Sequence, residues 1–399
     1  MEESKNTILA INGGSSSIKF ALFDTEGGIK ELFHGELEGI GKKNSEVSFT
    51  NDVTSKKFTS NTVIHDHKAA ADFLINWLET EDGFDCLKAV GHRIVYGKGY
   101  TEPVEIGTDL MNELSDISIY DPEHLPGEIK IIEAFSRRFQ GIKQIACFDT
   151  SFHASMPPVA KIISIPRRYF GMGIQRYGFH GLSYAYLMEE VKRITDNKTA
   201  RGKIILAHLG NGASIAAVKD GKSIDTSMGF TPTSGLPMST RTGDMDPGVA
   251  LYLMKTATLD PQQFNDLINH KSGLLGVSGT SSDMRDLLKC EGTDNHAAEA
   301  IDLFCYQTKK WIGSFAAALG GLDVLVFSGG IGENAPEVRA RICNNLEFLG
   351  IELDASKNLN NELIISKEKS KVPVYVMRTN EELMVAKLVC QVMHYKVKT

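Results

Sequence analysis

The stretch that decides the fold is ILAINGGSSSIKF, which runs from Ile8 to Phe20. A second stretch, ILAHLGNGASIAA, runs from Ile205 to Ala217 and matches the first without a gap. Each reads as an apolar strand, a tight turn of Gly, Asn and Ser, and a second strand that opens with Ser-Ile. One copy alone is typical of an ordinary β-hairpin. Two copies predict a duplicated domain, in which two turns aim backbone N–H groups at phosphate from either side of one cleft.

Length and composition indicate a globular protein with two domains. The chain has 399 residues, of which 42% are hydrophobic and 23% charged. These values are ordinary, and the length is too great for one small core. A net charge of −7 disfavours nucleic acid and anionic membranes as partners. The richest apolar stretch, residues 311–327, is interrupted by glycines and an aspartate, so we do not expect it to span a membrane.

The cysteines and histidines form no recognisable metal motif. The six cysteines are scattered without a C-x-x-C pair, and several lie in apolar runs, where Cys behaves as a small hydrophobe. We expect them to be reduced core residues of a cytoplasmic protein. There is no H-E-x-x-H motif, so zinc is not expected, whereas magnesium held by Asn, Glu and nucleotide phosphates fits the residue types better.

Alternating strand and helix patterns follow each copy of the hairpin. After the first copy we expect helices near residues 70–78 and 128–139, and strands at residues 87–95 and 144–148. After the second copy we expect a long helix over residues 297–319, closed by a glycine pair, and strands at residues 322–327 and 372–376. Thr379 or Asn380 is expected to cap a last helix. The second half starts near residue 150.

Two glycine-rich segments in the second half are candidate nucleotide contacts. Residues 328–334 read SGGIGEN after a buried strand, and glycines permit close approach of a base or phosphate. The segment lacks both G-x-G-x-x-G and P-loop spacing, so a structural turn is the alternative. Residues 272–285 end in Asp283-Met284-Arg285, where Asp can accept from ribose hydroxyls and Arg can stack on adenine. The alternative there is a loop that caps a helix beginning near Asp283.

Four polar residues stand at predicted strand ends or beside glycine in turns: Arg93, Asp149, His180 and Arg241. Two arginines and a histidine can stabilise the charge on the oxygens of a phosphoryl group. A carboxylate can orient a nucleophile or accept a proton. Each residue alone is more typical of a surface or structural position, but a neighbouring glycine favours close ligand approach.

Ten segments, in order along essentially the whole chain, resemble the acetate kinase family of the sugar-kinase, heat-shock-70 and actin superfamily. They cover residues 12–19, 91–95, 148–157, 176–181, 208–214, 225–232, 240–247, 272–285, 330–334 and 379–382. The resemblance implies an α/β, duplicated ribonuclease-H-like two-domain fold with an interdomain active-site cleft. It implies an N-terminal domain of residues 1–149 plus 381–399, with the acyl side and magnesium. Residues 150–380 would form a C-terminal nucleotide-binding and dimerisation domain.

The resemblance also implies an activity and a set of site residues. The activity is reversible, Mg²⁺-dependent, direct in-line phosphoryl transfer from ATP to acetate, giving acetyl phosphate and ADP, with Mn²⁺ able to substitute. The implied metal residues are Asn12 and Glu381, and the implied catalytic residues are Asp149, His180 and Arg241. The acyl group would contact Arg93, Val95, Phe179 and Pro232. The nucleotide would contact Lys19, His208, Leu209, Gly210, Asn211, Gly212, Asp283, Met284, Arg285, Gly330, Ile331, Gly332, Glu333 and Asn334. The resemblance implies a homodimer, with a short-chain carboxylate and ATP as partners.

Three segments depart from the family pattern near the implied acyl site. Residues 120–124 read YDPEH where the family usually shows HNPPN, and residues 233–239 read TSGLPMS where it shows LEGLMMG. Tyr96 and Lys98 replace His and Gly. Acyl-chain preference therefore stays open, and a propionate or butyrate kinase is an alternative. A chaperone-like or filament-forming ATPase and a pseudo-enzyme that only senses nucleotide stay open as well.

Overall fold

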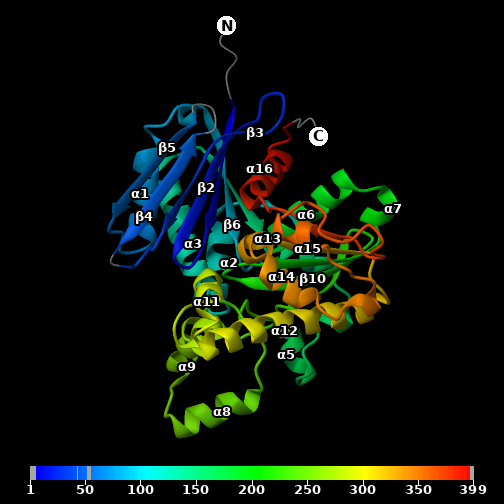
Figure 1. The fold of residues 1–399 in the computed structure, drawn as a ribbon. Coiled ribbons are helices and arrows are strands. Elements are labelled where there is room, and N and C mark those ends of the chain that lie inside the picture. The colour runs from blue at the N-terminus through cyan, green and yellow to red at the C-terminus, as the bar shows by residue number, and fades with distance from the viewer. Residues whose placement is uncertain (1–5, 43, 52–54, 396–399) are drawn as a thin grey trace. The chain divides into compact units, whose positions relative to one another are not determined.

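Two β-sheets organise the chain in the computed structural model, which describes residues 6–42, 44–51 and 55–395 (Figure 1). One compact unit comprises Met1–Ser151 and Asn380–Thr399, and we call it unit 1. The other, unit 2, comprises Phe152–Thr379. Each unit has its own sheet, helices and buried apolar core.

Unit 1 is built on an eight-stranded sheet in the order β5-β4-β3-β2-β1-β6-β8-β7. Its strands are β1 (Thr7–Gly13), β2 (Ser17–Asp24), β3 (Lys30–Glu38), β4 (Ser45–Asn51), β5 (Lys56–Thr62), β6 (Leu87–Ile94), β7 (Val104–Glu105) and β8 (Lys143–Phe148). Its helices are α1 (His67–Leu78), α2 (Thr108–Ile117), α3 (Leu125–Arg138) and α16 (Glu381–Val392), with a short 3₁₀ helix at Phe84–Cys86.

Helices cover both faces of the unit 1 sheet. Val90 of β6 belongs to the core that α1 and α3 share with the sheet. Its neighbour Gly91 faces the other way, where an added Cβ would collide with Val385 and Val389 of α16. Because successive side chains on a strand point to opposite faces, α16 covers the face that α1 and α3 do not. The buried β1, β6 and β8 strands are parallel, as expected for a sheet covered on both sides.

Unit 2 is built on a five-stranded sheet in the order β11-β10-β9-β12-β13. Its strands are β9 (Lys203–Leu209), β10 (Ala213–Lys219), β11 (Lys222–Thr226), β12 (Val324–Ser328) and β13 (Val374–Val376). Its helices are α4 (Pro158–Lys161), α5 (Arg167–Gly171), α6 (Gly181–Ile194), α7 (Asn197–Ala200), α8 (Pro247–Thr256), α9 (Pro261–His270), α10 (Gly273–Ser278), α11 (Met284–Cys290), α12 (Asn295–Leu319), α13 (Gly329–Asn334), α14 (Pro336–Cys343) and α15 (Ala355–Leu359). Short 3₁₀ helices lie at Ser151–Ser155 and Glu347–Leu349.

The two sheets share one topology. In unit 1 the central order is β3-β2-β1-β6-β8, and in unit 2 the order is β11-β10-β9-β12-β13. The first two neighbouring pairs are antiparallel in each unit, and the last two are parallel. The α/β fold with a duplicated core, expected from the repeated hairpin, is therefore confirmed.

The gapless match between the two hairpins is wrong at the turn, because the two loops differ in length by one residue. In the first hairpin, the residues from Gly14 to Ser17 separate the paired residues Gly13 and Ile18. In the second, residues 210–212 separate the paired residues Leu209 and Ala213, so this loop is one residue shorter. The gapless match pairs Gly13 with Gly210 and Ile18 with Ile215, so it misplaces the end of the turn by one residue on the first strand and by two on the second.

Several predicted elements are confirmed and two are corrected. Helix α12 ends at Gly320, whose φ of 69° is left-handed, and Asn380 caps α16 by accepting from Leu383 N at 2.7 Å. Helix α3 begins at Leu125 rather than at residue 128, because a proline in its first turn suits the start of a helix. Residues 329–334 form helix α13 instead of an open turn, since the left-handed φ of 76° at Gly329 lets the chain turn directly from β12 into it.

The prediction that the cysteines are core residues is confirmed for four of the six and wrong for Cys86 and Cys290. All six cysteines are free, with Cys86 and Cys290 partly exposed and the others buried. Within the described ranges, no helix combines the length and apolar character that crossing a membrane would require.

Candidate active site

Arg93 and Asp149 meet at the ends of two parallel strands of unit 1. Arg93 Nη2 donates to Asp149 Oδ2 at 2.8 Å, and the Asp149 side chain is fully buried. Burial acts to lower the pKa of the Arg93 guanidinium, but the charges of Asp149 and Glu381 outweigh it and hold the pKa above its usual range. Arg93 is therefore a fixed positive charge at the carboxyl edge of the sheet, where open α/β sheets bind ligands.

Asn12 at the end of β1 meets the first turn of α16. Its Nδ2 donates to Glu381 Oε2 at 2.9 Å and to Glu382 Oε1 at 3.0 Å. Glu381 Oε2 also lies 3.8 Å from Arg93 Nε. Glu382 was not singled out from the sequence, although it stands beside Glu381.

The donor set at Asn12, Glu381 and Glu382 suits magnesium. Over the described part of the chain, no three His, Cys, Asp or Glu side chains form a group that could hold a metal ion. A site here would consist of two carboxylates and an amide oxygen, with phosphate and water as further ligands. Mg²⁺ binds in this way, through one or two carboxylates and substrate phosphates, so the residues fit the ion.

Lys19 borders this acidic cluster. It lies on β2 directly opposite Asn12, and its Nζ is 3.8 Å from Glu36 Oε1. Burial acts to lower the pKa of the Lys19 amine, but Glu36, Glu382 and Glu381 outweigh it and raise the pKa. The structure thus brings Lys19 together with the candidate metal residues of unit 1, whereas the other predicted nucleotide contacts belong to unit 2.

Val95 is held in place by a buried carboxyl that the sequence did not reveal. The two oxygens of Glu128 accept from Val95 N at 3.2 and 3.3 Å. Both residues are almost fully buried. Glu128 is the second functional candidate in unit 1 that local sequence patterns missed.

His180 and His208 lie side by side in unit 2. His180 precedes α6 in a left-handed conformation, with φ of 59°, and its Nδ1 is 2.9 Å from Ser214 Oγ. The centroids of the His180 and His208 rings are 4.5 Å apart. His208 Nδ1 is 2.8 Å from Ser183 Oγ. Hydroxyl groups therefore orient both imidazoles.

Arg241 reaches the same place. An added Cβ on Gly212 would lie 3.0 Å from His180 Nε2 and 3.9 Å from Arg241 Nη1. Arg241 Nη1 also donates to Pro232 O at 3.4 Å. Phe179, which precedes His180 in the chain, and Pro232 are both buried. The predicted residues His180, Arg241 and Gly212 are thus brought together, and Gly212 leaves room for a close approach.

The 208–212 turn and the 328–334 segment of unit 2 lie next to each other at the ends of β9 and β12. Ser328 is paired with His208, and an added Cβ on Gly210 would lie 3.8 Å from Gly330 N. Glu333 Oε1 accepts from Gly329 N at 2.9 Å, which fixes the start of α13. Leu209 is fully buried, so only its backbone is available to a ligand. Backbone amides at such a strand-to-helix junction suit phosphate oxygens.

Asp283 and Arg285 contact each other at the start of α11. Asp283 caps the helix by accepting from Arg285 N at 2.8 Å, and Arg285 Nη2 lies 2.6 Å from Asp283 Oδ2. Met284 is buried. The capping alternative is therefore confirmed, and the Arg285 side chain is 84% exposed, so it is accessible to a ligand.

Comparison with known proteins decides the family. The profile of the Acetokinase family matches residues 7–387. The chain belongs to the acetokinase family. Acetate kinase from Rhodopseudomonas palustris is 42% identical over 396 residues, covering 96% of this chain and 97% of that protein. Acetate kinase from Thermoanaerobacterium thermosaccharolyticum is 43% identical over 391 residues, covering 95% and 97% respectively.

Solved structures within the acetokinase family include enzymes named for two acids. The acetate kinase of Porphyromonas gingivalis superposes with a TM-score of 0.86 and 36% identity, covering 97% of this chain and all of that one. A propionate kinase from Francisella tularensis superposes with a TM-score of 0.89 and 36% identity, covering 96% and 98%. Global similarity to the family therefore does not distinguish the two acids.

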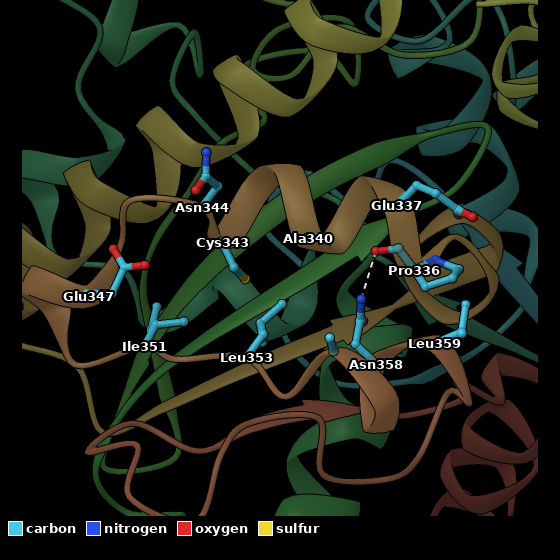
Figure 2. A pocket seen from close by; sticks show the side chains of 11 residues that line it. Pro336, Glu337, Ala340, Cys343, Asn344, Glu347, Ile351, Leu353, Asn358 and Leu359 are labelled. Carbon is cyan, nitrogen blue, oxygen red and sulfur yellow. Dashed lines mark hydrogen bonds between the residues drawn. The ribbon is translucent and has the colours of Figure 1, made fainter.

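A separate pocket in this member of the acetokinase family lies between α14 and α15 (Figure 2). Its volume is about 410 Å³, and none of the predicted site residues lines it. Asn358, in its wall, donates to Pro336 O at 2.8 Å and accepts from Arg339 Nε at 2.8 Å. Arg339 Nη1 in turn donates to Gly332 O at 2.9 Å and to Glu333 O at 3.0 Å. The buried Arg339 thus supports the glycine segment, which the sequence did not indicate.

Proposed function

We propose that this chain is an acetate kinase, which transfers a phosphoryl group reversibly between ATP and acetate, with acetyl phosphate and ADP as products. The observation that carries the proposal is the buried Arg93–Asp149 pair beside Asn12, Glu381 and Glu382. A guanidinium that can bind a small carboxylate therefore lies next to side chains that can hold a metal ion. We take the reaction from the acetate kinases that are about 42% identical to this chain.

In unit 1, we propose that Arg93 binds the carboxylate of the acid. Asp149 is the proposed catalytic carboxylate. Acetate is ionised at neutral pH, so its oxygen can attack without a general base. Asp149 accepts from Arg93 and thereby orients the guanidinium. Asn12, Glu381 and Glu382 would hold Mg²⁺, with Mn²⁺ able to substitute. When bound, the ion would neutralise charge on the phosphate oxygens.

In unit 2, we propose that His180 and Arg241 stabilise the negative charge that develops on the transferred phosphoryl group. Phosphoryl transfer depends mainly on positioning and electrostatic stabilisation, which an imidazole and a guanidinium supply. The His208–Gly212 turn and the Gly330–Asn334 segment offer backbone N–H groups to the nucleotide phosphates. We assign Asp283 and Arg285 to the nucleoside end of the nucleotide.

We also propose a cytoplasmic homodimer that associates through unit 2. No residue of α8 is buried, and Val249, Leu251 and Tyr252 are exposed on it. Exposed apolar residues gathered on one helix support an interface between copies. Light scattering coupled to gel filtration should give twice the mass of one chain, and a monomer at micromolar concentration would contradict this.

Acyl phosphate trapping tests the activity. Purified protein is incubated with ATP, Mg²⁺ and hydroxylamine in the presence of individual acids from C2 to C5. Hydroxamate formation with acetate is expected, and ATP consumption should require an acid. Higher kcat/KM for propionate or butyrate would favour those acids, as the propionate kinase neighbour allows. ATP hydrolysis without acyl product would favour an ATPase, and nucleotide binding without reaction would favour a pseudo-enzyme.

A further inference from the structure

Tyr184 and His180 lie one helical turn apart at the start of α6. Tyr184 N donates to His180 O at 3.0 Å, and His180 itself immediately precedes the helix. The side chain of Tyr184 is fully buried in the core of unit 2. Its hydroxyl group is therefore shielded from solvent and depends on protein partners for its hydrogen bonds.

Ser214 connects the Tyr184 hydroxyl to the His180 imidazole. Its Oγ is hydrogen-bonded to Tyr184 Oη and lies 2.9 Å from His180 Nδ1. Ser214 is also fully buried, on β10. A serine hydroxyl has one proton, which it can donate to only one of these two groups. Because a phenol is a stronger acid than an alcohol, Tyr184 is the better donor to Ser214, which leaves the serine proton for His180 Nδ1.

The other nitrogen of the His180 imidazole faces a space that a ligand can reach. An added Cβ on Gly212 would lie 3.0 Å from His180 Nε2 and 3.9 Å from Arg241 Nη1, so both side chains border the same point. All three residues are partly exposed. The charge of Arg241 disfavours a second positive charge on the imidazole. A neutral imidazole that accepts at Nδ1 carries its proton on Nε2, where it can donate to a phosphoryl oxygen.

We propose that Tyr184 is a positioning residue, which acts through Ser214 to hold the His180 imidazole neutral with its proton on Nε2. The inference rests on the proposed function, because it takes His180 to stabilise negative charge on the transferred phosphoryl group. With the proton on Nδ1 instead, the imidazole would present a lone pair to the phosphoryl oxygen and would repel it. A partner at Nδ1 that fixes the reactive tautomer is a general requirement of catalytic imidazoles.

A double-mutant cycle between Tyr184 and His180 separates this action from a role in packing. Tyr184→Phe keeps the ring and removes the hydroxyl, and it should lower kcat for acetyl phosphate formation by about tenfold or more. KM for ATP and for acetate should stay within a few fold. In the His180→Ala background the same change should cause no further loss, because the group through which Tyr184 acts is gone.

Tyr186→Phe is the matched control, since Tyr186 lies partly exposed on the same helix and should tolerate the change without loss of kcat. Ser214→Ala interrupts the same connection and carries the test should Tyr184→Phe not fold. It should reproduce the loss of kcat, and Tyr184→Phe should add nothing to it. Nuclear magnetic resonance of protein labelled with nitrogen-15 in its histidine rings reports the tautomer, the His180 signal being the one that His180→Ala removes.

Unaltered kcat in Tyr184→Phe would overturn the inference, provided that His180→Ala itself lowers kcat. An equal loss with and without the His180 imidazole would also overturn it, since that result indicates a role in packing alone. A His180 ring that carries its proton on Nδ1 would do the same. Normal turnover of His180→Ala counts instead against the role of His180 in the proposed function, so the two failures are distinguishable, and the resonance spectra then still test the tautomer.

Discussion

Arg93 Nη2 and Asp149 Oδ2 form a buried ion pair, 2.8 Å long, at the ends of β6 and β8. Removing one partner of such a pair leaves an uncompensated buried charge, at a cost of about 3–5 kcal/mol. Substitution of either residue is therefore expected to lower stability as well as activity, and tests at this position must separate the two effects.

Asp149→Asn keeps the size of the side chain and removes its charge. We expect kcat for acyl phosphate formation to fall by about 10²–10³, because the guanidinium loses its orientation. Nucleotide affinity, measured by titration calorimetry, should change much less. Circular dichroism confirms the fold before kinetics are compared, and Asp149→Ala should behave in the same direction. Normal turnover would show that this carboxylate has been misassigned.

Arg241→Ala should lower kcat by roughly 10²–10³ while the dissociation constant for ATP stays within a few fold. The reason is that Arg241 is proposed to stabilise negative charge that develops only during phosphoryl transfer. Arg201→Ala serves as the control, since Arg201 is an exposed arginine of the same unit. Equal loss of ATP affinity and turnover would indicate a ground-state role instead.

Glu381→Gln and Glu382→Gln should each raise the Mg²⁺ concentration for half-maximal activity by about tenfold or more. Each change removes one carboxylate from a cation that keeps few protein ligands. The Mg²⁺ dependence is measured at saturating ATP and acetate, with Glu133→Gln as an exposed control. An unaltered Mg²⁺ requirement in both variants would remove these residues from the metal site.

Gly212→Ala introduces a methyl group 3.0 Å from His180 Nε2. We expect lower kcat with little change in stability, on the order of 1 kcal/mol, because the methyl presses on an imidazole at the surface of the turn. Gly313→Ala on α12 is the matched control, since a Cβ there meets nothing within 4 Å. It should leave activity unaltered and stabilise the helix slightly.

His92 should make stability depend on pH. Burial lowers the pKa of His92 from 6.5 to about 4, while the bond to Gln144 opposes the shift. The unfolded chain therefore binds a proton more readily, and stability declines as pH falls from about 6.5 to about 4, by up to roughly 3 kcal/mol. Urea unfolding at several pH values measures this decline. His92→Asn should flatten it, and an equally steep decline in that variant would contradict the assignment.

Much of the fold could be predicted because its signals are local. Apolar periodicity and glycine pairs identified both hairpins and α12, and these elements lie where they were expected. The register between Gly13 and Ile18 could not be predicted, since pairing depends on which residues face each other across the turn.

The site could be predicted only where motifs carry it. Asn12 and Glu381 are 369 positions apart, and only the family resemblance linked them before the structure did. Glu128 and Arg339 escaped notice because charged residues on helices are usually solvated. Their burial depends on what packs over each helix, which no local pattern records.

The return of α16 to unit 1 has a consequence for biosynthesis. A ribosome translates the whole of unit 2 before residues 381–392 emerge. Until then, Val385 and Val389 cannot cover the face of β6 at Gly91. Glu381 and Glu382 arrive on the same late segment. The nascent chain therefore cannot complete the proposed metal site at Asn12 until α16 has been made and has docked.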